Sequence, residues 1–441
     1  MGPEDVVLPA IRRFANEILQ RSCLRLQWSK SKVYNAEGTL PDNTLAGITV
    51  AGEVISRQSE PGMDCYGCPI GSDNFVRNML QARAEQIMED AIKSVDLLSG
   101  DRQALWTVLR LSISNRFGYF CQLVPPSLVE PVAKWLDSAL WERVLQPATG
   151  LSILRGEEGD TVISCPVANL DNLSFQEWVI RLPVKQYGWG LRKMEETCGP
   201  AFLGALETAI PYMSEIAPIM EGVWGGVECW GDRADTGTRW RVMLQSGCRE
   251  GIELRGVWSD ICAEAVDAAM WLGEEVPDVF LVREKGVGCG SVTGETRGKL
   301  VEAREKTRSK LLIQALEQFR PQKARPVWSW RQRDKLSTAW LLALPLPHTA
   351  LSNEEFSEAA AASLCLPSPA CHDRVGVVIN GRGRKEVDIY GDNVQSTCLK
   401  GDHWRQRHDQ IKLTIYRLCM WAGIPVEMEV FNMFSGLIPQ Q

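Results

Sequence analysis

Three pieces of sequence decide the expected fold: LRLQWSKSKV (residues 24–33), GITVAGEVI (47–55) and DCYGCPIGSD (64–73). In the first piece, Leu24, Leu26 and Trp28 alternate with other residues, a period of two that is typical of a half-buried strand. In the second, β-branched residues alternate with small or polar ones. The third is a short apolar strand that ends in a Gly/Pro turn. Together the three pieces predict a small sheet near the start of the sequence.

Apolar residues at helical spacing lie on both sides of this predicted sheet. Residues 6–19 predict one helix before it, and three stripes between residues 75 and 146 predict three consecutive helices with short connections, the pattern of a bundle. The stripes are Val76, Leu80, Ala84, Ile87 and Ala91; Ala104, Leu105, Val108, Leu109 and Leu111; and Leu128, Val132, Trp135, Leu136, Ala139 and Leu140. Further helices are predicted at 200–220 with a break at Pro211, at 261–272, at 295–319, and from a cap at Ser352 or Asn353 to Leu364. The predicted fold class is α+β, mostly α-helical.

The bulk composition is that of a folded protein of two to four domains. The 441 residues are 23% charged and 45% hydrophobic, which excludes a disordered chain. No apolar run is long enough to span a membrane, and the first residues lack the apolar core of a secretory signal. The 14 cysteines are scattered, which favours reduced thiols inside a cell. We therefore expect an intracellular protein, cytoplasmic or nuclear, with no membrane partner.

Charge is distributed unevenly along the sequence. The net charge is −7, but residues 297–335 hold 12 Lys/Arg and four Asp/Glu, a local +8 that leaves −15 for the rest. The negative total argues against a wholly basic nucleic-acid binder, so a contact with a nucleic-acid backbone is to be sought on this basic stretch. The candidate phosphate contacts on its predicted helix are Lys299, Arg304, Lys306, Arg308 and Lys310.

The order of these pieces resembles a known family. An amphipathic helix, then a strand with Lys30-Ser31-Lys32, then the turn before a helix, is similar to the palm edge of reverse transcriptases encoded by non-LTR retrotransposons. Residues 101–110 resemble a helix of that family's thumb, 182–192 resemble the loop that closes the thumb, and 340–356 resemble an element downstream of it. On that likeness the domains are expected at 1–74 (palm edge), 75–195 (helical thumb), 196–350 (helical connector) and 351–441 (a Cys/His α/β module opening an endonuclease-like region).

The resemblance implies roles for particular residues. Lys30 matches a lysine near the incoming nucleotide, although lysines here also suit a solvated turn. Cys65, Tyr66, Gly67, Cys68, Pro69 and Ile70 match the primer grip. In the thumb, Arg102, Arg110 and Arg116 are candidates for phosphate contacts, with ordinary surface arginines as the alternative.

Catalysis is not expected from this sequence by itself. The family holds two Mg²⁺ on palm aspartates, but no Asp-Asp dipeptide occurs here, and residue 1 falls where the resemblance places the end of the catalytic hairpin. The expectation is a fragment of such a polymerase, with no catalytic residue and no cofactor of its own. Its role would be to hold RNA or DNA weakly and without sequence preference, in association with other retroelement proteins.

A cysteine and histidine cluster near the end offers another chemistry. Cys371, Cys398, His403 and His408 are a candidate zinc site, though no C-x-x-C pair occurs among them. By resemblance, residues 388–398 match a knuckle in which Asn393 replaces an expected histidine, so a metal-free knuckle is equally open. Two alternative functions therefore stand beside the first: a metal-dependent nuclease or zinc-binding nucleic-acid module, and a non-enzymatic helical scaffold.

Overall fold

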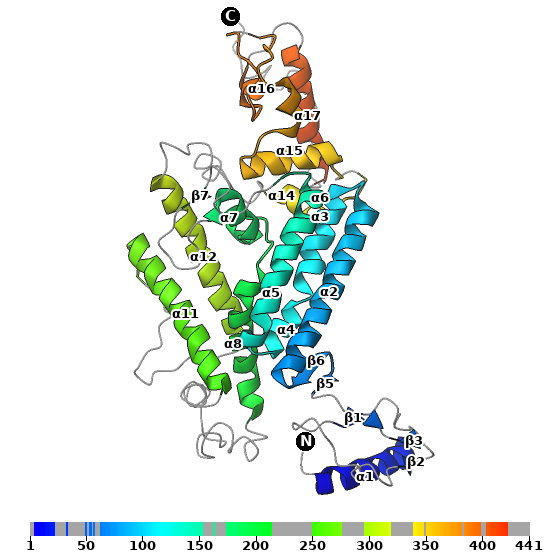
Figure 1. The fold of residues 1–441 in the computed structure, drawn as a ribbon. Helices are drawn as coiled ribbons and strands as arrows, with labels where there is room; N and C mark the ends of the chain where they lie inside the picture. Colours follow the sequence, from blue (N-terminus) through cyan, green and yellow to red (C-terminus); the bar gives the residue numbers. More distant parts are fainter. Residues whose placement is uncertain are drawn as a thin grey trace, which may run out of the picture. The chain divides into compact units, whose positions relative to one another are not determined.

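A computed structural model describes most of the sequence. The described residues are 4–22, 32–33, 49–50, 53–54, 56–57, 62–152, 162–163, 173–213, 249–275, 295–318, 338–347, 350–381, 383–397 and 403–421. Helices account for most of them, and the described strands form two-stranded sheets (Figure 1). The structure is therefore mostly helical with small β elements, as the sequence predicts.

The longer helices come in chain order with short ones between them. They are α1 (Glu4–Ser22), α2 (Asp73–Leu98), α3 (Arg102–Leu111), α4 (Gly118–Leu123), α5 (Pro126–Leu140), α6 (Gln146–Thr149), α7 (Phe175–Arg181), α8 (Met194–Met213), α11 (Arg249–Leu272), α12 (Glu295–Gln318), α14 (Ala339–Leu342), α15 (Asn353–Leu364), α16 (Asp392–Ser396) and α17 (His403–Trp421). Single 3-10 turns lie at Ile113–Asn115, Val184–Gln186 and Pro369–Arg374, and a π turn at Trp141–Leu145.

The strands are short and pair in twos. β1 (Lys32–Val33) pairs in parallel with β4 (Ser56–Arg57), and β2 (Thr49–Val50) pairs antiparallel with β3 (Glu53–Val54). The longest pair is the antiparallel hairpin of β5 (Gly62–Cys65) and β6 (Cys68–Gly71). β7 (Val162–Ile163) and β8 (Leu173–Ser174) form the fourth. Where one strand is expected at 64–73, the structure has this hairpin, because Tyr66 and Gly67 turn the chain back on itself.

The described residues group into two compact units. Unit 1 comprises residues 1–91, 112–141 and 192–305; unit 2 comprises residues 92–111, 142–191 and 306–441. Each unit thus gathers segments that are far apart in the sequence. The four domain boundaries expected from the sequence remain a prediction.

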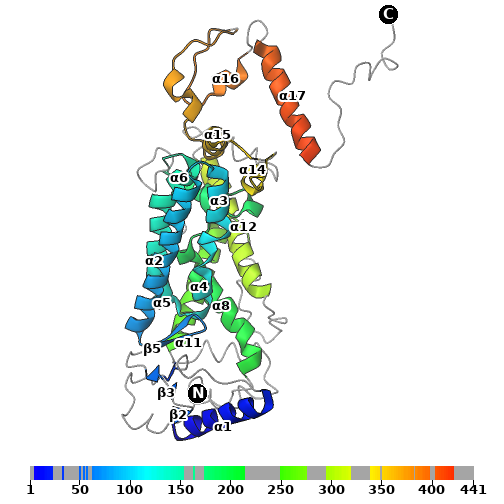
Figure 2. The same ribbon diagram turned by 90° about the vertical axis from the view of Figure 1, so that its right-hand side faces the viewer.

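Unit 1 is built around α8, which packs against α4, α5 and α11; in both views α4, α5 and α8 lie side by side (Figures 1 and 2). The start of α8 is fixed by Asp137 of α5, whose carboxylate accepts hydrogen bonds from the backbone N–H of Met194 (3.0 Å) and Glu195 (2.9 Å). A carboxylate at this point satisfies amides that have no partner within the helix. Its burial raises its pKa to about 6, against the lowering effect of the two amides.

Most of the predicted apolar stripes are buried. All five residues of the α2 stripe are buried, as are Leu105 and Leu109 on α3 and five of the six on α5. Trp135 and Leu111 are exceptions, with exposed fractions of 38% and 54%. The break expected at Pro211 falls close to the end of α8 at Met213, and α11 begins at residue 249, earlier than expected.

Unit 2 has a core of aromatic rings between α3, α6, α14 and α15. Trp106 of α3 meets Trp189 edge to face at a centroid distance of 5.1 Å, Trp189 meets Trp340 at 5.7 Å, and Trp340 meets Phe356 at 5.2 Å. Such T-shaped pairs are favourable beyond the area they bury. The N-terminus of α15 has a full capping box, in which Ser352 and Glu355 bond each other's backbone amides, so the cap expected at Ser352 is confirmed.

Candidate nucleic-acid interface

The β5–β6 hairpin, where the primer grip is expected, ends in a two-residue turn. Tyr66 and Gly67 both have positive φ, 54° and 85°, the pattern of the tight type I′ hairpin turn. The Asp64 carboxylate accepts a hydrogen bond of 2.6 Å from the Gly67 N–H, and this bond stabilises the turn. Glycine suits this conformation, whereas a tyrosine with positive φ is strained by roughly 1 kcal/mol or more.

Tyr66 therefore stands at a strained tip and faces solvent. Its exposed fraction is 98%, while its carbonyl accepts a 3.0 Å hydrogen bond from the hydroxyl of Tyr119 on α4. The backbone of the tip is thus fixed to a helix of the same unit, and the aromatic ring is left free. Of the other expected primer-grip residues, Pro69 is buried, Ile70 is exposed, and Cys65, Gly67 and Cys68 are half-buried.

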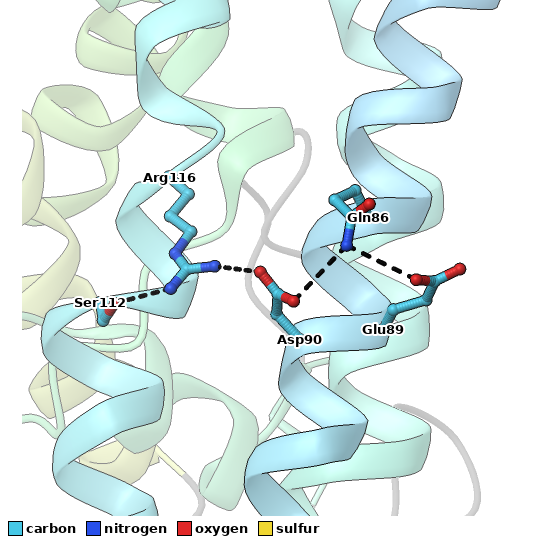
Figure 3. Close-up of polar contacts among 5 residues, drawn as sticks. All are labelled: Gln86, Glu89, Asp90, Ser112 and Arg116. Carbon is cyan, nitrogen blue, oxygen red and sulfur yellow. Dashed lines mark hydrogen bonds and ion pairs between the residues drawn. The ribbon is translucent and has the colours of Figure 1, made fainter.

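Arginines of unit 1 lie on α2 and before α4, each beside a carboxylate. Arg83 is 3.4 Å from Asp64. Arg116 forms a 2.6 Å ion pair with Asp90 and donates to the Ser112 hydroxyl, and Gln86 donates to the same Asp90 carboxylate (Figure 3). Ion pairs this exposed are worth about 0 to 1 kcal/mol, so a phosphate can compete for either arginine. Arg116 is one of the three expected thumb arginines.

The other two expected thumb arginines belong to unit 2 and are turned inward. Arg102 donates from its backbone N–H to the Asn353 side chain (2.9 Å) and from its guanidinium to the Asn353 carbonyl (3.1 Å) and the Ser357 hydroxyl (2.8 Å). Burial lowers the pKa of Arg110. Arg102 therefore joins α3 to α15 within the unit, and its expected phosphate contact remains a prediction.

The motif at 101–110 has an internal use that the sequence did not reveal. Asp101 accepts the Ala104 N–H at 2.8 Å and so caps α3. The buried Gln103 donates to the Ala343 carbonyl at 3.1 Å and accepts from the Leu351 N–H at 2.7 Å. One side-chain amide thereby bonds both ends of the segment between α14 and α15, an arrangement called here the Gln103 clasp. It joins two of the stretches that carry the family resemblance, 101–110 and 340–356.

The loop at 182–192 belongs to unit 2 as far as Leu191 and packs within that unit. Trp189 donates from its backbone to Val179 (2.9 Å) and from its ring nitrogen to the Ser363 hydroxyl (3.0 Å). Gly190 has φ +80°, and Gly188 lies where an added Cβ would overlap the Leu182 backbone. The loop is a packing element, as a Gly-rich turn predicts.

The expected basic helix is α12, and its cations differ in their surroundings. Arg304 pairs with the buried Glu264 of α11 at 2.5 Å and donates to the Glu196 carbonyl at 2.9 Å. Lys306 is exposed, while Arg308 and Lys310 are half-buried. The side chain of Lys299, and Lys30 as a whole, lie outside the described residues. Arg304 is thus a structural ion-pair residue of unit 1.

The Cys/His cluster is described only in part. Cys371 is half-buried with its sulfur close to Gly391, and the exposed His408 has its ring nitrogen 3.4 Å from Asp409. Cys398 and the His403 side chain lie outside the described residues. Within the described part of the chain, no group of three or more His, Cys, Asp or Glu side chains is placed to hold a metal. Zinc at this cluster remains a prediction.

The segment in which the knuckle is expected is described up to Thr397, and it is held by hydrogen bonds around Asp388. Partial burial raises the pKa of Asp388, but the backbone amides of Asn393, Asp392 and Tyr390 outweigh it and hold that pKa below its usual value. Asn393 donates from its side chain to the Glu386 carbonyl at 2.9 Å. The asparagine that replaces the expected histidine therefore closes this loop itself.

Comparison with family models, curated proteins and solved structures finds no significant match for this chain. None of the helices in the described ranges is long and apolar enough to cross a lipid bilayer. Sequence reasoning had missed Tyr119, Arg83 and Asp64 as supports of the hairpin. Only the position of Asp64 directly before the turn gave a local signal, since Asp often bonds the backbone near a turn.

Proposed function

We propose that this chain holds a strand of RNA or DNA in the manner of the primer grip and thumb of a retroelement reverse transcriptase. The proposal concerns strand binding alone and assigns no polymerase chemistry to these residues. Binding would be weak, dependent on salt and independent of sequence, because phosphate contacts and stacking do not distinguish bases.

The observation that carries the proposal is Tyr66. Its aromatic ring is 98% exposed, while its backbone has φ of 54° and its carbonyl is bonded to Tyr119, so the backbone is held and the ring is free to meet a partner. Strained residues held by their surroundings concentrate at binding sites. A base stacked on such a ring is worth about 1 to 3 kcal/mol.

Arginines of the same unit supply the charge that a strand needs. Arg83 pairs with Asp64 at the base of the turn, and Arg116 pairs with Asp90. Both arginine side chains are about half exposed, 50% and 44%. Phosphate can replace a carboxylate partner at low energetic cost when the pair is this exposed. Arg77, also exposed on α2, adds a further cation.

The test is fluorescence anisotropy with a labelled primer–template duplex that carries a single-stranded overhang. We compare the wild type with Tyr66→Asn, because asparagine favours the same turn and keeps the hairpin folded. Loss of one stacked base should weaken binding by about 5- to 150-fold.

A matched control is Tyr390→Ala, which removes an exposed tyrosine (37% exposed) from unit 2. It should bind as the wild type does. Arg116→Ala should reduce the slope of log affinity against log salt concentration by about 0.7 to 0.9, the value for one phosphate contact. Equal binding by Tyr66→Asn and the wild type, or an affinity that does not change with salt, would overturn the proposal.

A further inference from the structure

We propose that Cys65 and Cys68 form a redox-active dithiol on the β5–β6 hairpin, which reacts with a small-molecule disulfide such as glutathione disulfide and closes into an intramolecular disulfide. This modification site goes beyond the nucleic-acid function proposed above and does not depend on it.

The hairpin register places the two cysteines opposite each other. Cys65 is the last residue of β5, Cys68 is the first residue of β6, and the two are direct partners in the antiparallel pair. Side chains of direct partners project from the same face of a hairpin, with Cβ atoms about 4.5 to 5.5 Å apart. A disulfide needs about 3.5 to 4.5 Å. The hairpin must therefore tighten by about 1 Å, at its tip, to form the bond.

Both sulfurs are free thiols and lie within reach of a reagent. Each cysteine is half-buried, and the residue next to Cys65 is the fully solvated Tyr66. Burial, then the charges of Cys65 and Asp64, raise the pKa of Cys68. An effect of Cys65 on the pKa of Cys68 is consistent with two sulfurs that lie near each other, as the hairpin register requires.

The reaction is a balanced exchange in two steps. One hairpin thiolate attacks the small disulfide, forms a mixed disulfide and releases one molecule of the small thiol. The second hairpin cysteine, as thiolate, then attacks the bonded sulfur of the first and releases the second molecule of small thiol. The protein loses two protons and two electrons, and the small disulfide is reduced to two thiols. The second step is intramolecular, so it competes well with attack by free thiol.

A second cysteine pair makes the contrast clear. The Cys121 and Cys198 sulfurs are only 3.4 Å apart, between α4 and α8. Each residue is 1% exposed, and their thiols donate to helix carbonyls at Phe117 and Met194. Buried and hydrogen-bonded, this pair is closed to an attacking reagent even though its sulfurs are already close.

The test uses the reduced full chain under native conditions with glutathione disulfide. After an acid quench and alkylation, peptide mapping by mass spectrometry reports the state of each cysteine. The closed Cys65–Cys68 disulfide should exceed glutathione adducts on these two residues by about tenfold or more, because closure is intramolecular.

Variants separate closure from simple modification. Cys68→Ser should leave a stable glutathione adduct on Cys65, while the double variant Cys121→Ser/Cys198→Ser should form the hairpin disulfide as the wild type does. Stable glutathione adducts on both hairpin cysteines of the wild type would overturn the proposal. So would two free thiols at 65 and 68 in the folded chain while the urea-unfolded chain reacts.

Discussion

Tyr66 and Gln103 belong to two motifs of the same resemblance, but the side chain of Tyr66 is exposed to solvent and that of Gln103 is buried. Tyr66 of unit 1 is 98% exposed, whereas Gln103 of unit 2 is 1% exposed and bonded to Ala343 and Leu351. A buried side chain whose hydrogen bonds are all internal stabilises its own chain. An exposed side chain on a backbone that is held in place is available to a partner. The difference teaches that a motif must be sorted by burial before a binding role is given to it.

The same division runs through the basic residues. Arg304 and Arg102 are occupied inside their units, while Arg83 and Arg116 are tied only by exposed pairs. Changes at Arg304 or Arg102 should lower the free energy of unfolding and leave strand binding per folded molecule unchanged. Changes at Arg83 or Arg116 should weaken strand binding and leave the free energy of unfolding nearly unchanged.

The largest effect is expected at Arg304. Arg304→Met leaves the Glu264 carboxylate, whose side chain is 7% exposed, without its partner. Breaking a buried pair in this way costs about 3 to 5 kcal/mol of unfolding free energy. Urea denaturation followed by circular dichroism measures it. The control is Lys306→Ala on the same helix, which should change stability by less than about 0.5 kcal/mol; equal losses in the two variants would contradict the inward placement of Arg304.

Gln103→Ala should cost about 2 to 4 kcal/mol, because it removes a buried side chain, opens a small cavity and leaves the carbonyl of Ala343 and the amide of Leu351, both half-buried, without this partner. The same urea titration measures the loss. Gln86→Ala, an exposed glutamine on α2, is its control and should be near neutral. A clasp variant as stable as this control would show that the contacts to Ala343 and Leu351 contribute little.

Asp137 predicts a pH dependence of the free energy of unfolding. Its pKa is about 6 in the folded chain and 3.8 for a free aspartate, so the folded state binds the proton more tightly. Its contribution to stability is complete below about pH 4 and is lost as the pH rises through 6, a change of up to about 3 kcal/mol. Asp137→Asn lacks this titration. Wild-type stability relative to the variant should therefore fall between about pH 4 and pH 7, and a constant difference would contradict it.

The smallest effect has the opposite sign. Tyr66→Asn should stabilise the chain by about 0.5 to 1 kcal/mol, because asparagine tolerates positive φ better than tyrosine does. Thermal unfolding monitored by circular dichroism measures the gain. Together with the weaker strand binding expected of the same variant, it would show strain retained for contact with a partner. A loss of stability would mean that the ring packs where the structure leaves it exposed.

The sequence by itself determined the local features of this protein. Helical spacing of apolar residues located α2, α3 and α5 and predicted that the α2 stripe is buried, and the cap expected at Ser352 or Asn353 marked the start of α15. Hydrophobic periodicity and capping depend on residues three or four apart, so a linear pattern contains them. The β5–β6 hairpin is also a local feature, but one strand was expected at 64–73, because a tyrosine in the first turn position is not a usual signal of a two-residue turn.

The tertiary structure alone decided which polar residues are internal. Arg304 meets Glu264 across 40 residues, and Gln103 reaches Ala343 across 240. No periodic pattern contains such pairs, because they depend on how helices pack and on the partner that each buried polar atom needs. For the same reason the sequence grouped Arg102, Arg116 and Arg304 as alike, whereas burial in the folded chain separates one exposed cation from two internal ones.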